Sequence, residues 1–451
     1  MLLSGYDPVM YSRILTSFTL AFHIIYATIG VGVPLMIALA EWIGIRRNDA
    51  HYLLLARRWA RGFVITVAVG VVTGTAIGLQ LSLLWPSFMR VAGQSIALPL
   101  FMETFAFFFE AIFLGIYLYT WDRFKNKMVH FWLLVPVVIG SSASAFFITV
   151  VNAFMNAPAG VTVVDGAITD ISPFGAMLSP AMPTKVSHVL ITAYTTCAFA
   201  LAAIAAFSLL KGRNHVYHKK ALKMTMVSAF VFLIGSAVIG DLSGKYLANY
   251  QPEKLAAMEW HFETSSQAPL VLGGILDANN NIKYGLKIPY ALSILAHGLP
   301  NAEVTGLNDI PDDEEPPLWI HYLFDIKMGF VALMVLISVV FMLVLWRKRH
   351  LAYTNKWLLR AIVLAAPVSM LTIEHGWIFA EVGRQPWILH GIMKTSEGAT
   401  TSDHVDTMLI VFTALYAVLG FTSVRVLIKM FKSNHVEDEM KARGIEEGDG
   451  Q

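Results

Sequence analysis

The sequence has little charge and almost no cysteine. Asp, Glu, Lys and Arg make up 14% of its 451 residues, whereas 56% are hydrophobic and the mean hydropathy is +0.60. A soluble domain carries about 25% charged residues, so this composition indicates a membrane protein. The single cysteine, Cys197, lies in an apolar run, which excludes a disulfide framework and a cysteine-based metal or iron–sulfur site. The formal net charge of +2 gives no indication of nucleic-acid binding.

Nine apolar runs in the sequence are long enough to cross a bilayer. They lie at about 14–42, 62–85, 97–120, 131–155, 186–210, 222–243, 318–346, 357–380 and 404–428. The first run is too long for the hydrophobic core of a signal peptide and lacks a basic start, so we expect a retained helix. The sequence therefore predicts an all-α integral membrane protein with nine transmembrane helices.

Lys and Arg are concentrated in every second connection between these runs. The basic connections hold Arg46, Arg47, Arg57, Arg58 and Arg61; Arg123, Lys125 and Lys127; Lys211, Arg213, Lys219, Lys220 and Lys223; Arg347, Lys348, Arg349, Lys356 and Arg360; and, after the ninth run, Lys429 and Lys432. Because basic loops stay in the cytoplasm, we expect the N-terminus outside and the C-terminus inside.

This topology divides the chain into four parts. Helices one to six occupy 1–243 with an outer loop at 156–185, a second outer loop occupies 244–317, helices seven to nine occupy 318–430, and a polar cytoplasmic tail occupies 431–451. The loop at 244–317 is too long for an idle link between packed helices. Because it mixes aromatic, apolar and charged residues, we expect it to be functional.

Several side chains that can bind a metal or a proton fall in the outer half of the predicted bundle. They are His23, Glu103, Glu110, His188, Met328, Glu374, His375 and Glu381. Glu103 and Glu110 are seven residues apart and therefore share nearly one helix face. Imidazole, thioether and carboxylate groups can ligate haem iron, and ionisable groups inside a membrane commonly mark a functional site. The pattern predicts a cofactor or ion site near the outer surface, without pairing the ligands.

Each of these residues has a simpler interpretation when it is taken alone. A histidine at a helix start is commonly an interface residue, a methionine such as Met328 commonly packs in the core, and Lys327 can reach lipid headgroups. Trp377 and Trp387 suit membrane-interface anchors, and Arg384 suits a neutralising partner for an acid. A transporter or channel would also place acids and histidines in helices, but no Gly/Pro-broken helices occur at matching positions of two halves. A structural membrane subunit leaves the buried acids unexplained.

Three motifs of unusual composition lie at predicted helix ends and in the outer loops. They are Glu381-Val-Gly383-Arg384-Gln385-Pro386-Trp387; Gly240-Asp241-Leu-Ser243-Gly244 with Gln251-Pro-Glu-Lys254-Leu-Ala-Ala-Met-Glu259; and Asn152-Ala-Phe-Met155-Asn156-Ala-Pro158-Ala-Gly160. With these motifs the chain resembles subunit I of the cytochrome bd quinol oxidases, in the branch with a short quinol-binding loop. The resemblance runs from the first helix to the ninth.

The resemblance implies a terminal oxidase of the respiratory chain in a bacterial or archaeal cytoplasmic membrane. Such an enzyme oxidises ubiquinol or menaquinol at the outer face, reduces O2 to water and generates a proton-motive force by vectorial proton uptake and release, without pumping. The resemblance also implies a second multi-helix subunit and a small single-helix subunit as partners, within membrane lipid and without nucleic acid.

The resemblance implies haem ligands as well. His188 and Met328 would be the axial ligands of haem b558. Glu381 and His23 would be the protein ligands of two high-spin haems, b595 and either haem d or another b-type haem. In one departure, many relatives have Arg two residues before the axial methionine, whereas this chain has Ile326. Two further residues would contact the cofactors: Trp377 and Arg384.

The same resemblance implies residues for substrate and protons. Lys254 and Glu259 would form the quinol site in the outer loop. Glu103 and Glu110 would lie on the proton route to the oxygen-reducing haem. No cluster of histidines has the spacing of a copper site, so we expect no copper.

Overall fold

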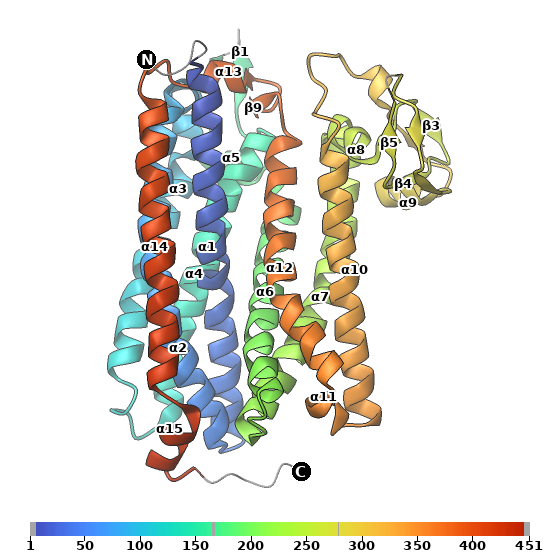
Figure 1. Ribbon diagram of the computed structural model, residues 1–451. Helices are drawn as coiled ribbons and strands as arrows, with labels where there is room; N and C mark the ends of the chain where they lie inside the picture. The colour runs from blue at the N-terminus through green and yellow to red at the C-terminus, as the bar shows by residue number, and fades with distance from the viewer. Residues whose placement is uncertain (1–5, 165–166, 278, 446–451) are drawn as a thin grey trace.

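The computed structural model describes residues 6–164, 167–277 and 279–445, and long, roughly parallel helices dominate it (Figure 1). Within these residues nine helices are long and apolar enough to cross a membrane, as predicted. They are α1 (Pro8–Arg46), α2 (Ala50–Leu84), α3 (Pro86–Tyr119), α4 (Lys127–Asn156), α6 (Met182–Leu210), α7 (Val216–Tyr250), α10 (Ile320–Arg347), α12 (Lys356–Val382) and α14 (Val405–Ser433). Most are longer than the predicted runs, because hydropathy marks the apolar part of a helix and not its polar ends.

Polar residues at the helix starts explain several of these boundaries. The side chains of Asp7, Asp49, Asn126 and Asn355 each accept a hydrogen bond from a backbone N–H in the first turn of the following helix, at 2.9–3.0 Å. Such caps satisfy amides that have no partner within the helix. These caps determine the first residues of α1, α2, α4 and α12, which hydropathy alone does not predict.

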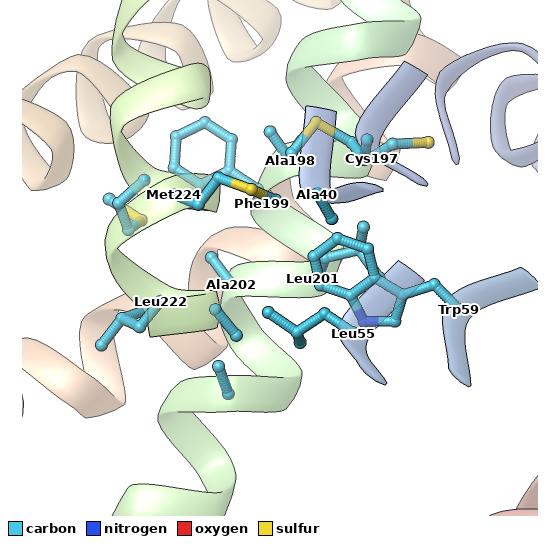
Figure 2. Packing of buried hydrophobic residues seen from close by; sticks show 14 of the residues in the cluster. Ala40, Leu55, Trp59, Cys197, Ala198, Phe199, Leu201, Ala202, Leu222 and Met224 are labelled. Atoms are coloured by element: carbon cyan, nitrogen blue, oxygen red, sulfur yellow. The ribbon is translucent and has the colours of Figure 1, made fainter. Parts of the chain in front are cut away.

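Close packing between α1 and α6 depends on small side chains. A Cβ at Gly32 would lie 2.6 Å from both the Ala193 carbonyl oxygen and the Cys197 Sγ, so only glycine fits there. Figure 2 shows Cys197, Ala198 and Ala202 packed with residues of neighbouring helices. In a membrane, where lipid is as apolar as the protein core, small residues allow the close backbone approach that stabilises helix pairs.

The chain between α7 and α10 folds into a small unit beside the bundle, which Figure 1 shows at the end that carries α8. Its elements are α8 (Pro252–Glu259), β3 (Ser265–Ser266), β4 (Leu270–Leu272), β5 (Ile275–Leu276), β6 (Ile282–Lys283), β7 (Leu286–Ile288), α9 (Ala291–His297), β8 (Glu303–Val304) and the 3-10 turn η1 (Leu307–Asp309). The strands pair as nested antiparallel ladders, β3 with β8, β4 with β7 and β5 with β6. The predicted long loop is therefore folded. Its strands escape a sequence-based prediction because two or three residues are too few to show an alternating pattern.

The loop at 156–185 is also partly structured. It contains the hairpin of β1 (Thr162–Val164) and β2 (Ala167–Thr169), followed by α5 (Pro173–Met177). A third connection, after α12, holds β9 (Trp387–Leu389), β10 (Met393–Lys394) and α13 (Thr395–Gly398). The end of the bundle that carries these three connections is called the loop end below.

At the opposite, tail end, the segment predicted as a polar tail is only partly a tail. The helix α14 continues to Ser433, and α15 (Val436–Ala442) buries Val436 and Met440 in the main core. The Glu439 carboxylate pairs with the guanidinium groups of Arg58 and Arg61 on α2. The apolar positions of α15 are too few to stand out in a hydropathy profile. The short helix α11 (Leu351–Thr354) lies at the same end.

Candidate functional site

Glu381, near the last turn of α12, lies where three helices meet at the loop end. Its Oε1 accepts a hydrogen bond from Asn152 Nδ2 of α4 at 2.7 Å, and its Oε2 accepts one from Arg384 Nη2 at 2.5 Å. Lys185 of α6 donates to Asn152 Oδ1 at 3.1 Å. Two of the sequence motifs, around Asn152 and around Glu381, thus form one partly buried polar group.

The turn after α12 is shaped by contacts of its own residues. Gln385 Oε1 accepts a hydrogen bond from Thr395 Oγ1 at 2.9 Å, and Arg384 Nη1 donates to the Ile388 carbonyl. A Cβ at Gly383 would lie 2.7 Å from Lys254 Cε and 2.8 Å from the Phe379 carbonyl oxygen. The glycine of this motif therefore makes room for the side chain of Lys254, which comes from the long loop.

Four cationic side chains gather around this helix end: Lys185, Lys254, Lys327 and Arg384. Lys254 is 2% exposed, donates to the Ala380 carbonyl at 2.9 Å and lies 5.0 Å from the ring centroid of Phe379. The Lys327 Nζ lies 5.2 Å from the same ring centroid. Burial, and then the charge of Lys185, lower the pKa of Lys254 well below its ordinary value. Three acids, Glu253, Glu259 and Glu381, interact with these four cations and leave an excess of positive charge. Because buried cations need anionic partners, this excess fits a propionate group of a haem.

His23 of α1 is held in an orientation that suits a metal ligand. Its Nδ1 lies 2.8 Å from the Thr73 Oγ1, and that hydroxyl donates its own proton to the Val69 carbonyl at 2.9 Å. The hydroxyl therefore accepts from His23 Nδ1–H, so Nε2 carries the free lone pair. A ligating histidine commonly donates its second nitrogen to a fixed acceptor in this way.

His188 and Met328 come from different helices beside the cationic group. His188, on α6, has a buried Nδ1 with no hydrogen-bond partner among the described residues. Met328, on α10, is 42% exposed, and the adjacent Lys327 interacts electrostatically with His188. An imidazole nitrogen without a partner and an exposed thioether at neighbouring positions fit axial ligands of a haem.

Three predicted residues of α12 share one face. Glu374, Trp377 and Glu381 are spaced by three and four residues and therefore lie one above another. The buried Oε1 of Glu374 has no hydrogen-bond partner among the described residues. His375, by contrast, bonds through Nδ1 to the Leu371 carbonyl of its own helix at 2.7 Å. Glu374 is therefore better placed than His375 to serve the site.

Glu103 and Glu110 both face α4, as their spacing predicts. Glu103 Oε1 accepts a hydrogen bond from Ser144 Oγ at 2.8 Å, and a Cβ at Gly140 would lie 2.9 Å from Glu110 Cβ. We name these four residues, Glu103, Glu110, Gly140 and Ser144, the α3–α4 seam. The small residues of α4 let the two helices close over the acids.

A buried polar group nearer the tail end was not predicted from the sequence. Glu41 of α1 accepts hydrogen bonds from Tyr117 Oη at 2.6 Å and from His130 Nδ1 at 2.8 Å, and His130 Nε2 lies 2.9 Å from the Tyr117 carbonyl oxygen. One signal was available, because Tyr117 continues the seven-residue spacing of Glu103 and Glu110. Glu41 and His130 themselves lie near helix ends and resemble ordinary interface residues.

Lys254 and Glu259, both on α8, point toward different neighbours. Five residues along a helix correspond to a rotation of about 140°, so the two side chains leave different faces. Lys254 lies against α12, whereas Glu259 interacts with Asp325 and Lys327 of α10 and accepts a hydrogen bond from the Val271 amide. Glu259 is 1% exposed, and burial, followed by the charge of Asp325, raises its pKa well above the ordinary value.

Comparisons with known proteins agree over nearly the whole chain. The family model described as cytochrome bd terminal oxidase subunit I matches residues 11–435. The chain is 41% identical over 440 residues to the putative cytochrome bd menaquinol oxidase subunit I of Bacillus subtilis (strain 168), covering 96% of this chain and 99% of that protein. It is 26% identical over 498 residues to the cytochrome bd-II ubiquinol oxidase subunit 1 of Escherichia coli (strain K12), covering 94% and 96%. The solved bd oxidase from Geobacillus thermodenitrificans superimposes with a TM-score of 0.92 and 65% identity, covering 96% of this chain and 100% of that chain.

Proposed function

Because the chain belongs to the family of cytochrome bd terminal oxidase subunit I, we propose that it oxidises membrane quinol and reduces O2 to water. It is a multi-pass protein of the bacterial cytoplasmic membrane and a haem-carrying respiratory oxidoreductase that acts with a second subunit. The finer proposal adds a small single-helix subunit. It also places quinol oxidation at the outer face, with energy conserved by vectorial proton uptake and release.

The buried cations at the loop end are the single observation that carries the haem proposal. Lys185, Lys254, Lys327 and Arg384 outnumber the three acids that interact with them, Glu253, Glu259 and Glu381, and a haem propionate would balance the excess. A bound haem supplies an iron that accepts single electrons and, where a position is open, binds oxygen.

The proposed ligands come from the family resemblance, and the side chains described above are compatible with them. His188 and Met328 would hold haem b558 in six-coordinate form. His23, through Nε2, and Glu381 would hold the two high-spin haems, b595 and either haem d or a further b-type haem. Arg384 fixes one oxygen of Glu381 at 2.5 Å, and Trp377 lies on the same face of α12.

In the proposed quinol site, Glu259 takes a hydroxyl proton of the substrate. A carboxyl with a raised pKa is a better base near neutral pH than an ordinary one, because it binds the proton more tightly. The Lys254 ammonium fixes α8 to the last turn of α12 and so places the loop over the haem ligands. Protons for oxygen reduction would pass along Glu110 and Glu103 of the α3–α4 seam.

The proposed orientation places the loop end outside, because the basic connections lie at the other end. A periplasm-type reporter inserted within 260–310 should be active, and one fused after Lys432 should report the cytoplasm. The opposite pattern would place the quinol site on the inner face.

A reduced-minus-oxidised absorption spectrum of the purified two-subunit complex tests the function. We expect haem b bands, and a far-red band if haem d is present. His188→Ala and Met328→Leu should remove the low-spin signal, whereas Met342→Leu on the same helix should retain it. If Met328→Leu keeps the low-spin signal, another residue is the ligand. A haem-free preparation with transport activity would favour a transporter instead.

A further inference from the structure

Glu259 belongs to a cluster whose other members have no role in the proposed function. The loop cluster consists of Glu259 at the end of α8, His321 and Asp325 in the first turns of α10, and residues 271–273 at the end of β4. Figure 1 shows α8 and the short strands beside the loop end of α10. The cluster joins three segments that lie far apart in the sequence.

One short strand segment binds all three titratable groups. The Val271 amide donates to the Glu259 carboxyl, and the Gly273 amide donates to Asp325 Oδ2 at 2.5 Å. The Gly273 carbonyl oxygen lies 3.2 Å from His321 Nε2, which is also 3.2 Å from Asp325 Oδ2. The strand β4 ends at Leu272 and Gly273 has a left-handed backbone (φ +63°), so the turn at the end of the strand presents these backbone groups to α8 and α10 together.

The residues on both sides of Glu259 also contact His321. The Met258 carbonyl oxygen lies 2.7 Å from His321 Nδ1, and the Trp260 ring stacks on the imidazole with centroids 3.9 Å apart. Trp260 Nε1 donates to the Leu318 carbonyl at 2.8 Å. His321 is fully buried and thereby fixes the end of α8 against the start of α10. The distance from Glu259 to Asp325 is therefore determined by packed neighbours and not by a mobile loop.

Two carboxyl oxygens in the cluster have no hydrogen-bond partner among the described residues. They are Glu259 Oε1 and Asp325 Oδ1, both buried atoms on carboxyl groups that interact electrostatically. Buried carboxyl oxygens without hydrogen bonds lower the stability of the folded protein. A purely structural role of the cluster therefore does not explain why two such acids lie next to each other. The Asp325 side chain is 15% accessible, whereas Glu259 is 1% exposed, so accessibility increases from the first acid to the second.

We propose that Asp325, positioned by His321 and Gly273, receives the proton that Glu259 takes from quinol and releases it at the loop end. This inference rests on the proposed quinol site at Glu259. Oxidation of one quinol breaks two O–H bonds, and its two electrons go to the haem acceptor. Each proton passes from the quinol hydroxyl to Glu259, then to Asp325 and then to water. Glu259 is thereby deprotonated again before it accepts the second proton of the quinol. The groups that face Glu259 are Asp325 and Lys327 of α10 and the backbone of β4.

The test compares Asp325→Asn, Asp325→Glu and Glu259→Gln with a control, Asp312→Asn, which changes an exposed acid of the same loop. The kcat and KM for quinol are measured over a range of pH in H2O and in D2O, and haem absorbance per protein monitors folding. Asp325→Asn should lower kcat about tenfold at every pH, leave KM near the wild-type value and increase the solvent isotope effect. Asp325→Glu should restore most of kcat, and the control should behave as the wild type.

Several results would overturn the relay. A raised KM with unchanged kcat would mean that Asp325 only helps to bind substrate. A pH profile shifted to lower pH with the same maximum would mean that Asp325 acts only as a negative charge beside Glu259. If Asp325→Asn does not assemble, Asp325→Ser, which also lacks the carboxyl, takes its place. A wild-type kcat and isotope effect in that variant would exclude a relay role, whereas a lower kcat with a larger isotope effect would support it. If Glu259→Gln oxidises quinol normally, the quinol site itself is wrong, whereas an inactive Glu259→Gln with a normal Asp325→Asn refutes the relay alone.

Discussion

Two regions of the molecule bury carboxyl groups, and they position them in different ways. In the α3–α4 seam, Glu103 and Glu110 repeat with the period of one helix and face small residues of the next helix in the chain. In the loop cluster, Glu259 meets Asp325 and a strand backbone that are brought to it by tertiary folding. The first arrangement follows from local periodicity, and the second depends on the fold of the whole loop. The regions should therefore respond differently to substitution.

Glu381→Ala should have the largest effect, because this carboxylate lies where α4 and the long loop both contact α12. It bonds to Asn152 of α4, and the neighbouring Ala380 carbonyl holds Lys254 of the loop. Its loss removes a proposed haem ligand and leaves the buried Arg384 without its acidic partner, which costs about 3–5 kcal/mol. Haem content and oxygen consumption with any donor should both collapse. Asp403→Ala, an exposed acid, is the control. Full haem content with normal oxygen uptake would remove Glu381 from the site.

Glu259→Gln should impair quinol oxidation at the loop cluster without impairing oxygen reduction, which depends on the α3–α4 seam. Quinol oxidation should fall about 100-fold, whereas haem bands and oxygen uptake with a donor that releases no protons should persist. Because burial and Asp325 raise the pKa of Glu259, the wild-type rate should fall as the pH drops through that pKa and the base becomes protonated. The variant should lack this acid limb. Glu263→Gln, on an exposed acid four residues later, is the matched control. Loss of haem in Glu259→Gln would instead show that the loop cluster is structural.

The same contrast explains what the sequence could predict. Hydropathy and charge were sufficient for the nine helices, and the period of the helix placed Glu103 and Glu110 on one face. The short strands and the loop cluster were missed, because Val271, His321 and Asp325 carry no local pattern that points to Glu259. The opposed directions of Lys254 and Glu259 follow from helix geometry once α8 is known to be a helix. The haem ligand roles of His188 and Met328 came from family resemblance and stay predictions.

Glu110→Gln tests the seam without touching the loop. We expect turnover to slow about tenfold at the step that needs protons, because an amide cannot carry a proton onward as a carboxyl does. Quinol KM and the low-spin haem should stay unchanged. The measurement is the time-resolved oxygen reaction of the fully reduced enzyme. Ile112→Val, at an exposed apolar position of the same helix, is the control. An unaltered late phase in Glu110→Gln would take this acid off the proton route.

Tyr117→Phe should have the smallest effect on catalysis. It tests whether the proposed proton route of the α3–α4 seam continues beyond Glu110 toward the tail end. The phenol donates to Glu41 at 2.6 Å, so its loss leaves a buried carboxylate oxygen short of a partner and costs about 1–3 kcal/mol of stability. Between Tyr117 and Glu110 lie the buried apolar side chains of Leu114, Leu134 and Val137, which offer no hydrogen bonds to a proton in transit.

We therefore expect Tyr117→Phe to lower the apparent melting temperature while the late phase of the oxygen reaction keeps its wild-type rate. Tyr119→Phe is the matched control, because that side chain is 86% exposed on the same helix and its hydroxyl makes no hydrogen bond within the described residues. It should leave both the melting temperature and the kinetics unchanged. If Tyr117→Phe slows the late phase as Glu110→Gln does, then water must cross the apolar layer. The Glu41, Tyr117 and His130 group would then extend the proton route to the tail end, since hydrogen-bonded acids and imidazoles inside a membrane can form such relays.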